Sequence, residues 1–354
     1  MKRLVIKWLL LPLSGLYGLL TSFRNWLFDS QLLKSKRPGV YSISVGNLTV
    51  GGTGKTPMIE FLIKRSTHSN PAGIGETATL SRGYGRQTKG FRIATDADTA
   101  ETIGDEPLQL YRKFAPPVRV CVGERRVEAI QTLLQHHPET NQILLDDAFQ
   151  HRPVQPHLNI LLMDYNRPFY DDYPFPAGRL RERRQGARRA DGIVVTKCPL
   201  NLWPTEQQRI SHQIRSYTHP DIPIFFAGLH YSQPIAFETH QAGTTLTNVV
   251  LVTGLANADP LDHYVQQTFR LTRHFRFPDH YVYSRADLDI ILTQLPANTA
   301  VLTTEKDWVK LDALLTQDER MRWPLYYLPI KVQFLPGHEL AFTQFLDKNR
   351  LKNR

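Results

Sequence analysis

The stretch Val45-Gly-Asn-Leu-Thr-Val-Gly-Gly-Thr-Gly-Lys-Thr-Pro57 decides the fold of this chain. A β-forming run (40–45) precedes it, and a helix-forming run (58–64) follows it. A strand, a glycine-rich turn and a helix with Gly54-Lys55-Thr56 at the junction are the context of a phosphate-binding loop. Glycines let backbone N–H groups converge on phosphate oxygens, and the helix N-terminus adds its positive dipole end. The stretch therefore predicts a nucleotide-binding core.

Each polar residue of this loop has an expected role. Lys55 reaches the β- and γ-phosphates, and Thr56 places a hydroxyl on Mg²⁺. The usual spacing has a glycine where this chain has Thr49, so Gly51 and Gly52 supply the flexibility. The predicted nucleotide-binding residues are Thr49, Gly51, Gly52, Thr53, Gly54, Lys55 and Thr56.

A second signal is acidic. The apolar run 141–145 ends in Asp146 and Asp147, which is typical of the strand that holds Mg²⁺ beside a phosphate-binding loop. The sequence leaves open which of the two aspartates binds the metal directly.

Asp105 and Glu106 precede Pro107 and an apolar-periodic run, which predicts a helix start. Carboxylates there often only compensate the helix dipole. The alternative is a general base near the γ-phosphate; position alone favours the cap.

Arginines cluster at three places: Arg82 and Arg86 in a glycine turn, Arg125 and Arg126 before a helix, and six arginines within residues 179–189. Guanidinium groups make bidentate contacts to phosphate oxygens. A solvated helix face is the alternative for the third cluster, and an ordinary turn for the first.

The composition bounds the function. The 354 residues carry a net charge of +10, which indicates an acidic partner such as a phosphorylated substrate, an anionic membrane or a nucleic acid. Cys121 and Cys198 lack metal-type spacing, which argues against a disulfide framework and fits a reducing compartment.

The N-terminus is apolar and flanked by basic residues. Residues 8–23 carry no charge but are slightly short of a comfortable membrane span. On a helix, Ser14, Gly18, Thr21 and Asn25 fall on one side, and large apolar residues populate the rest. The basic flanks are Lys2, Arg3, Lys7, Arg24, Lys34, Lys36 and Arg37. The pattern favours a helix lying on a membrane surface, over a signal peptide, a short span or a core helix.

Strand and helix patterns alternate through residue 200, which predicts an α/β fold: a P-loop NTPase-type, doubly wound, mostly parallel sheet. We expect an N-terminal membrane-associated helix (1–37), a core (38–230), a second, smaller α/β lobe after a hinge (231–335) and a closing helix that packs back on the core (336–354).

These segments together resemble the tetraacyldisaccharide 4′-kinase (lipid A 4′-kinase) family of Gram-negative bacteria. The matching stretches cover nearly the whole chain. They are 45–57, Ser81-Arg-Gly-Tyr-Gly-Arg86, Gly104-Asp-Glu-Pro107, Asp146-Asp-Ala-Phe-Gln-His-Arg152, Ala177-Gly-Arg-Leu-Arg-Glu182, Phe277-Pro-Asp-His280 and Thr303-Thr-Glu-Lys-Asp307. The family's loop also lacks the first glycine; Ala148 departs from an expected glycine, and Pro260 lies later than expected.

The resemblance implies an enzyme that transfers the γ-phosphate of ATP, with Mg²⁺, to the 4′-hydroxyl of a tetraacylated glucosamine disaccharide 1-phosphate. It implies action at the cytoplasmic face of the inner membrane, with a lipid substrate, peripheral or monotopic attachment, no nucleic-acid partner and a monomer. Closure of the two lobes would assemble the site.

The resemblance also assigns residue roles. Asp105 would be the general base, and His280 from the second lobe would orient it. Asp146, Asp147, Thr56 and Glu182 would serve the metal. The substrate side would be formed by Arg82, Arg125, Arg126, Gln150 and Arg181.

Two other functions compete. A membrane-bound nucleotide switch would need no acceptor, but Pro199 in Thr196-Lys-Cys-Pro199 replaces the aspartate that reads guanine. A nucleic-acid-binding protein would show aromatic residues among its arginines, and this chain has no such signature.

Overall fold

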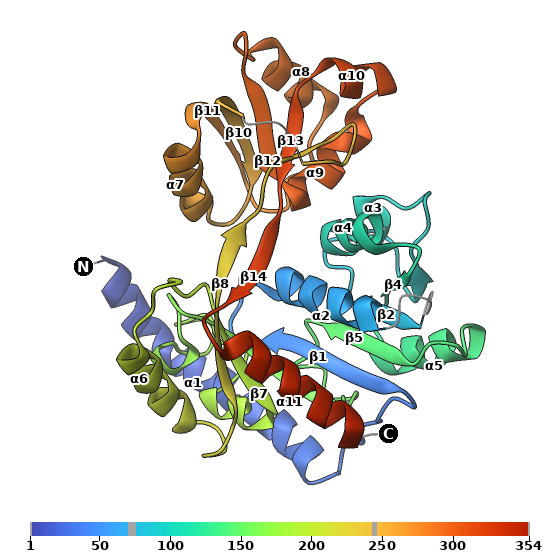
Figure 1. The fold of residues 1–354 in the computed structure, drawn as a ribbon. Helices are drawn as coiled ribbons and strands as arrows, with labels where there is room; N and C mark the ends of the chain where they lie inside the picture. The colour runs from blue at the N-terminus through green and yellow to red at the C-terminus, as the bar shows by residue number, and fades with distance from the viewer. Residues whose placement is uncertain (1, 70–75, 243–245, 353–354) are drawn as a thin grey trace.

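The computed structural model describes residues 2–69, 76–242 and 246–352, and Figure 1 shows two α/β lobes. The strands of the large lobe are β1 (Tyr41–Asn47), β2 (Thr77–Ser81), β3 (Arg92–Ile93), β4 (Val118–Val122), β5 (Gln142–Asp146), β6 (Leu158–Asp164), β7 (Gly192–Thr196), β8 (Ile224–Tyr231) and β14 (Ile330–Phe334). They form one sheet in the order β14-β8-β7-β6-β1-β5-β2-β4-β3. Only the pairs at the two edges, β14–β8 and β3–β4, are antiparallel. This confirms the predicted doubly wound, mostly parallel sheet.

The order of strands places the site. β1 lies between β5 and β6, so the chain runs from β1 toward one edge and later returns past β1 to build the other. The carboxyl ends of β1 and β5 lie side by side, with Val45 paired to Asp146. In an open α/β sheet, ligands bind at the carboxyl ends of the strands, where the order reverses.

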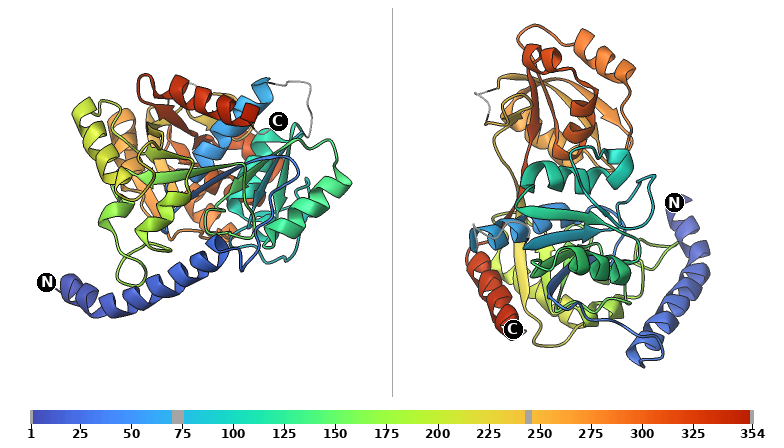
Figure 2. Two further views of the ribbon diagram at one scale, coloured as in Figure 1. Left: turned by 90° about the horizontal axis from the view of Figure 1, so that it is seen from below. Right: turned by 90° about the vertical axis from the view of Figure 1, so that its right-hand side faces the viewer.

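Helices cover both faces of this sheet (Figures 1 and 2). Their bounds are α2 (Lys55–Ser69), α3 (Ala100–Ile103), α4 (Asp105–Phe114), α5 (Arg126–His136), α6 (Pro204–Arg215) and α11 (His338–Lys352). Side chains alternate along a strand: Ile160 and Leu162 join the core with α2, α4 and α11, whereas Leu161 and Met163 pack with α6. Burial on both faces explains why these strands read as continuous apolar runs.

The N-terminal helix α1 (Lys2–Asp29) lies outside the second face, on the side of the large lobe opposite α11 (Figure 2). The side chains of Lys2, Arg3 and Lys7 lie outside the described residues. The small and polar stripe packs on the protein: Ser14 donates to the Pro174 carbonyl, and Tyr17 Oη donates to the Arg181 carbonyl at 3.0 Å. The apolar stripe remains exposed. Within the described residues, none of the helices combines the length and hydropathy that crossing a membrane requires.

The smaller lobe has its own sheet, ordered β11-β10-β12-β13-β9, with β9 alone antiparallel to its neighbour. Its elements are β9 (Ile235–Ala236), β10 (Asn248–Gly254), α7 (Asp259–Thr268), β11 (Arg270–Phe277), α8 (Arg285–Thr293), β12 (Ala300–Thr304), α9 (Glu305–Leu311), α10 (Gln317–Arg322) and β13 (Leu325–Leu328). A second α/β lobe is therefore present, as predicted.

The connection between the lobes differs from the prediction. We expect a polar loop as the hinge and a smaller lobe that extends to residue 335. Instead, β14 pairs with β8 as an antiparallel ribbon, with Tyr231 opposite Ile330, so β14 belongs to the large sheet. Figure 1 shows these two strands side by side between the lobes. Antiparallel pairing ties the two crossing segments to each other by backbone hydrogen bonds, which a single polar loop would lack.

The C-terminal helix packs on the large lobe, as predicted. Phe342 of α11 is buried against Phe225 of β8 and Phe334 of β14. Asp347 forms an ion pair with Arg65 of α2 at 2.6 Å.

Candidate active site

The glycine-rich loop follows β1 and leads into α2. Gly51 and Gly54 have φ angles of +107° and +81°, a region that other residues rarely adopt. Inside the loop, Asn47 Nδ2 donates to Thr53 Oγ1 at 2.8 Å, and Thr196 Oγ1 donates to the Thr53 carbonyl at 2.9 Å. The described atoms leave open space around the Cβ positions of Gly51 and Gly52. The loop is therefore held from beneath by side chains, and its outer side has room for phosphate groups.

Lys55 and the paired aspartates lie next to this loop. Lys55 Nζ is 3.7 Å from Asp147 Oδ1, and Arg181 Nη1 donates to both oxygens of Asp147 at 2.8 and 2.9 Å. Burial raises the pKa of Asp147, but Lys55 and Arg181 outweigh it and hold that pKa below its ordinary value. Asp147 is therefore a carboxylate with two cationic partners.

The pKa of the neighbouring Asp146 is shifted in the opposite direction. Its side chain is buried, and burial together with the nearby Glu106 raises its pKa to about 7. Among the described residues, no donor reaches its Oδ1 atom. A buried carboxylate with an unpartnered oxygen, on which the charge of Lys55 at the start of α2 acts, fits the place of a cation. The described residues hold no cluster of three or more His, Cys, Asp or Glu side chains able to bind a metal, but Mg²⁺ usually takes only one or two carboxylates and completes its shell with phosphates and water.

The two lobes meet at Asp105. This residue opens α4, and His280 of the smaller lobe contacts it, with Nδ1 3.1 Å from Asp105 Oδ2. Lys306 Nζ lies 3.2 Å from His280 Nε2. An ammonium group can only donate, so Nε2 accepts and the Nδ1–H donates to Asp105. Although burial raises the pKa of Asp105, His280, Lys310 and Lys306 lower it overall, so Asp105 is ionised at neutral pH.

Backbone geometry fixes this contact. Gly104 before Asp105 has a φ of +96°, and a Cβ there would lie 3.0 Å from the Tyr84 carbonyl. His280 has a φ of +57°, and the Tyr84 ring lies 5.2 Å from its imidazole between centroids. The turn at 81–86 thus supports His280, while Arg86 pairs with Glu124.

The stretch Thr303–Asp307 lies at the interface between the lobes, and most of its side chains have a partner there or within the smaller lobe. Thr304 caps α9, Lys306 also contacts Asp279 at 2.8 Å, and Asp307 accepts from the Gly254 N–H at 2.9 Å. Glu305 faces the other way and pairs with Lys113 of α4, which also pairs with Glu60 of α2 at 2.6 Å. One short helix therefore ties the smaller lobe to both α4 and α2.

Comparison with known proteins now identifies the family. The model of a family described as LpxK, tetraacyldisaccharide-1-P 4′-kinase, matches residues 6–350. The chain belongs to this kinase family. The curated tetraacyldisaccharide 4′-kinase of Cytophaga hutchinsonii is 41% identical over 98% of both chains, and that of Flavobacterium johnsoniae is 40% identical over 98% of both. The crystal structure of "apo" form LpxK from Aquifex aeolicus in complex with ATP aligns with a TM-score of 0.74 and 28% identity, over 96% of this chain and 98% of that chain.

Membership in the 4′-kinase family confirms the expected activity class, an ATP-dependent phosphotransferase of lipid A biosynthesis. The family's activity is that of a kinase, not of a nucleotide switch. The roles of single residues stay predictions, and the geometry separates them.

Arg126, Arg181 and Gln150 lie at the predicted centre. Arg126 is buried, its pKa is lowered to about 10 by burial, and the charges of Asp146 and Asp147 act on it. Gln150 Nε2 donates to the Asn47 carbonyl at the end of β1 at 2.9 Å. Arg125 instead points outward: its side chain is 80% exposed and pairs with Glu128. Arg82 is exposed, and its charge reaches Arg126.

Glu182 does not fit the metal role that we predict. Both of its oxygens are paired with Arg189, at 2.7 and 2.9 Å, and they also accept from Asn25 of α1 and from Gln150. A carboxylate so fully engaged has little capacity left for a cation. Its contacts instead connect α1 to the residue that supports the end of β1.

Four residues near the site escape the sequence prediction. Lys197 Nζ donates to the Gly52 carbonyl at 2.6 Å and pairs with Asp164 at 2.7 Å, while Lys306 and Lys310 surround Asp105. In the sequence, these residues could have been noticed at the strand ends Asp164 and Lys197 and in or just after the stretch Thr303–Asp307. Neither pattern indicates which residue each side chain contacts in the fold.

Proposed function

We propose that this chain transfers the γ-phosphate of ATP to the 4′-hydroxyl of a tetraacyldisaccharide 1-phosphate, with Asp105 as the general base. The observation that carries the proposal is the contact of Asp105 with His280, which joins the two lobes, while the next residue, Glu106, acts on the charge of Asp146. Phosphoryl transfer depends mainly on positioning and on stabilising charge. The loop, the paired aspartates and the cross-lobe pair provide these two functions separately.

The phosphates of ATP would bind in the open space outside Gly51 and Gly52, with Lys55 facing the transferred group. Thr56, Asp146 and Asp147 would hold Mg²⁺, which neutralises charge on the phosphate oxygens when bound. Asp146, with its high pKa and unpartnered oxygen, suits direct contact with the ion. Asp147 already has Lys55 and Arg181 as partners and would mainly keep those two cations in place.

The acceptor hydroxyl would approach Asp105. Because Asp105 is ionised and the Nδ1–H of His280 donates to one of its oxygens, the other oxygen can take the hydroxyl proton. Arg126 and Arg181 would stabilise negative charge near the loop, and Gln150 would orient the end of β1. Arg82, exposed beside Arg126, would meet the acceptor, and Arg125 would act only at long range.

The exposed stripe of α1 would place the acceptor end of the large lobe at the cytoplasmic face of the inner membrane. Its large apolar side chains are more than half exposed: Trp8, Leu9, Leu13, Leu16, Leu19, Leu20, Phe23 and Trp26. Monomeric proteins seldom expose an apolar stripe of this kind without a partner. A helix that anchors its polar face to the protein and turns its apolar face outward suits a lipid surface.

The decisive experiment measures phosphate transfer from labelled ATP to detergent-solubilised tetraacyldisaccharide 1-phosphate. Lys55→Ala should abolish transfer, while Asp105→Asn and His280→Gln should each lower kcat by about 10² to 10⁴, the usual contribution of a general base. His274→Gln is the matched control, since His274 pairs with Asp262 within the smaller lobe and away from Asp105. Wild-type turnover in Asp105→Asn would contradict the assignment of the base.

A further inference from the structure

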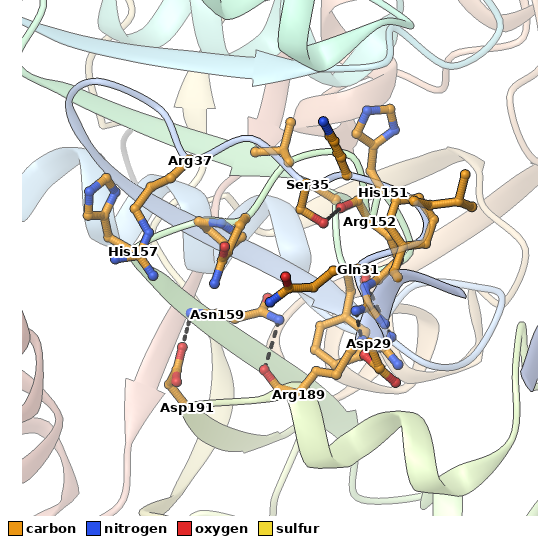
Figure 3. A pocket seen from close by; sticks show the side chains of 18 residues that line it. Asp29, Gln31, Ser35, Arg37, His151, Arg152, His157, Asn159, Arg189 and Asp191 are labelled. Atoms are coloured by element: carbon orange, nitrogen blue, oxygen red, sulfur yellow. Dashed lines mark hydrogen bonds and ion pairs between the residues drawn. The ribbon is translucent and has the colours of Figure 1, made fainter. Parts of the chain in front are cut away.

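A large cavity lies outside the candidate active site. It has a volume of about 670 Å³ and opens between the segment that leaves α1 (residues 28–37) and the segment between β5 and β6 (residues 148–157). Figure 3 shows its floor, formed by Asn159, Arg189 and Asp191. Volumes of this size are typical of ligand sites.

The floor of the cavity lies at the amino ends of the strands, whereas the phosphate-binding loop lies at their carboxyl ends. Asn159 stands near the start of β6, and Asp191 immediately precedes β7, whereas the loop and Asp146 follow the carboxyl ends of β1 and β5. A seven-residue strand such as β6 spans roughly 20 Å at about 3.3 Å per residue. The floor of the cavity is therefore separate from the place proposed for ATP.

Its lining is predominantly basic. Lys34, Arg37, Arg152 and Arg189 face two carboxylates, Asp29 and Asp191. Arg152 pairs with Asp29 at 2.6 Å and Arg189 pairs with Glu182, yet Arg152 Nη1 and Arg189 Nε are buried without a partner among the described residues. These two buried N–H groups could donate hydrogen bonds to a bound ligand.

The electrostatic potential around His151, which also lines the cavity, is positive as well. Burial, followed by the charges of Arg126, Arg24 and Arg82, lowers the pKa of His151 to about 4, so this lining imidazole stays neutral. Such surroundings oppose a cation and favour an anion with several acceptor oxygens, as in a phosphate group.

The rim of the cavity is apolar and continues the exposed stripe of α1. Leu33 lines it, the adjoining Leu32 is 66% exposed, and Trp26 in the last part of α1 is 54% exposed. Phe28 lines it from the last turn of α1, its ring between the guanidinium groups of Arg24 and Arg152 at 5.3 and 5.4 Å. An occupant that carries both phosphate and acyl chains would satisfy the floor and the rim together.

We propose that this cavity binds the phosphate-bearing headgroup of an anionic membrane lipid. The proposal rests on the membrane attachment of α1 proposed above, since a bilayer beneath that stripe delivers headgroups to the rim. Basic residues close to a membrane surface add to the affinity for anionic lipid in proportion to their number. The chain would thus hold a structural lipid next to the helix that anchors it.

The test measures sedimentation of the full-length protein with vesicles of phosphatidylcholine alone, or of phosphatidylcholine mixed with phosphatidylglycerol. The wild type should prefer the anionic vesicles, and Lys34→Gln/Arg37→Gln should reduce that preference roughly tenfold or more. Lys348→Gln/Lys352→Gln on α11 removes the same charge from the far side of the lobe, and it should keep the preference (Figure 2). Gln155→Trp, which narrows the cavity without changing charge, should lower the preference as well.

Several outcomes would overturn the proposal. Equal losses in the two double variants would reduce the effect to diffuse electrostatics. Displacement from anionic vesicles by the acceptor disaccharide, at concentrations that saturate turnover, would assign the cavity to the acceptor's own phosphate. Displacement by inorganic phosphate with no preference between vesicles would assign it to the free anion. Binding to vesicles of phosphatidylcholine alone reports on the apolar stripe of α1. If the protein did not bind these vesicles, the proposed membrane attachment of α1 would be contradicted. A preference for anionic vesicles that depends on Lys34 and Arg37 would still support lipid binding in the cavity.

Discussion

The adjacent residues Asp146 and Asp147 should respond in opposite directions to the same substitution. In metal-free protein at pH about 8, we expect Asp146→Asn to stabilise the large lobe and Asp147→Asn to destabilise it. The reason is electrostatic. Asp146 is a buried carboxyl with an unpartnered oxygen and Glu106 nearby, whereas Asp147 is paired with Arg181 and Lys55.

The magnitude follows from the pKa of Asp146, about 7 in the folded protein against an ordinary 3.8. Between these values the folded state keeps a proton that the unfolded state releases, so stability falls as pH rises through this window. The separation of roughly three pH units corresponds to about 4 kcal/mol, all of it present above pH about 7. An asparagine removes that cost but leaves an amide short of partners, at about 1–3 kcal/mol, so the net gain is about 1–3 kcal/mol.

For Asp147, stability depends on pH in the opposite direction. Its pKa is held below the ordinary value, so its contribution to stability is present above pH about 4 and is lost only as pH falls further. Asparagine in its place leaves Lys55 and Arg181 without their shared anion at every pH above that.

The assay is urea unfolding in the presence of a chelator, at pH about 5.5 and about 8.5. Amide hydrogen exchange in β1 and β5 should supply the readout, since two lobes need not unfold as one unit. About half of the cost at Asp146, ~2 kcal/mol, should appear between the two pH values. Mg²⁺ should stabilise the wild type and have little effect on Asp146→Asn. A loss of stability in Asp146→Asn that matches Asp147→Asn, or a gain independent of pH, would refute the reasoning.

Three further predictions concern the lobe interface and the arginines. Lys306→Met removes one of the cations that lower the pKa of Asp105, so the acid limb of the pH profile of kcat/KM should move to higher pH, with little change at alkaline pH. Lys113→Met should destabilise the protein by about 3–5 kcal/mol in thermal or urea unfolding, because Glu305 loses its buried cation, and adding Glu305→Gln should restore part of this. Arg125→Gln should change the KM of the acceptor by less than about fivefold, since its side chain is 80% exposed and an exposed charge contributes less than about 1 kcal/mol.

Much of the site followed from local pattern. The phosphate-binding loop needs consecutive glycines and a Lys-Thr pair at a helix start, so its residues are neighbours in sequence and are recognisable together. The same holds for Asp146 and Asp147 at the end of a strand, and for the small and polar stripe of α1. In each case one element of secondary structure with a fixed period determines which side chains share a face.

Other roles escaped because the relevant partners are distant in sequence. Position alone favoured a helix cap at Asp105, and the resemblance paired it with His280, but only the packing of the lobes shows Lys306 and Lys310 around them. The family resemblance assigned Glu182 to the metal or the substrate, but in the fold both of its oxygens accept from Arg189. Arg125 and Arg126 are adjacent, yet one is exposed and the other buried, since Arg125 caps α5 from outside and Arg126 is its first residue.

The sequence by itself therefore determined the class of fold, the phosphate-binding loop, the acidic strand end and the apolar stripe of α1, because short-range chain geometry dictates each of them. The tertiary structure alone decided the pairing of β8 with β14 between the lobes, the tautomer of His280 and the opposite states of Asp146 and Asp147. Those depend on charges and burial contributed by segments that only folding brings together.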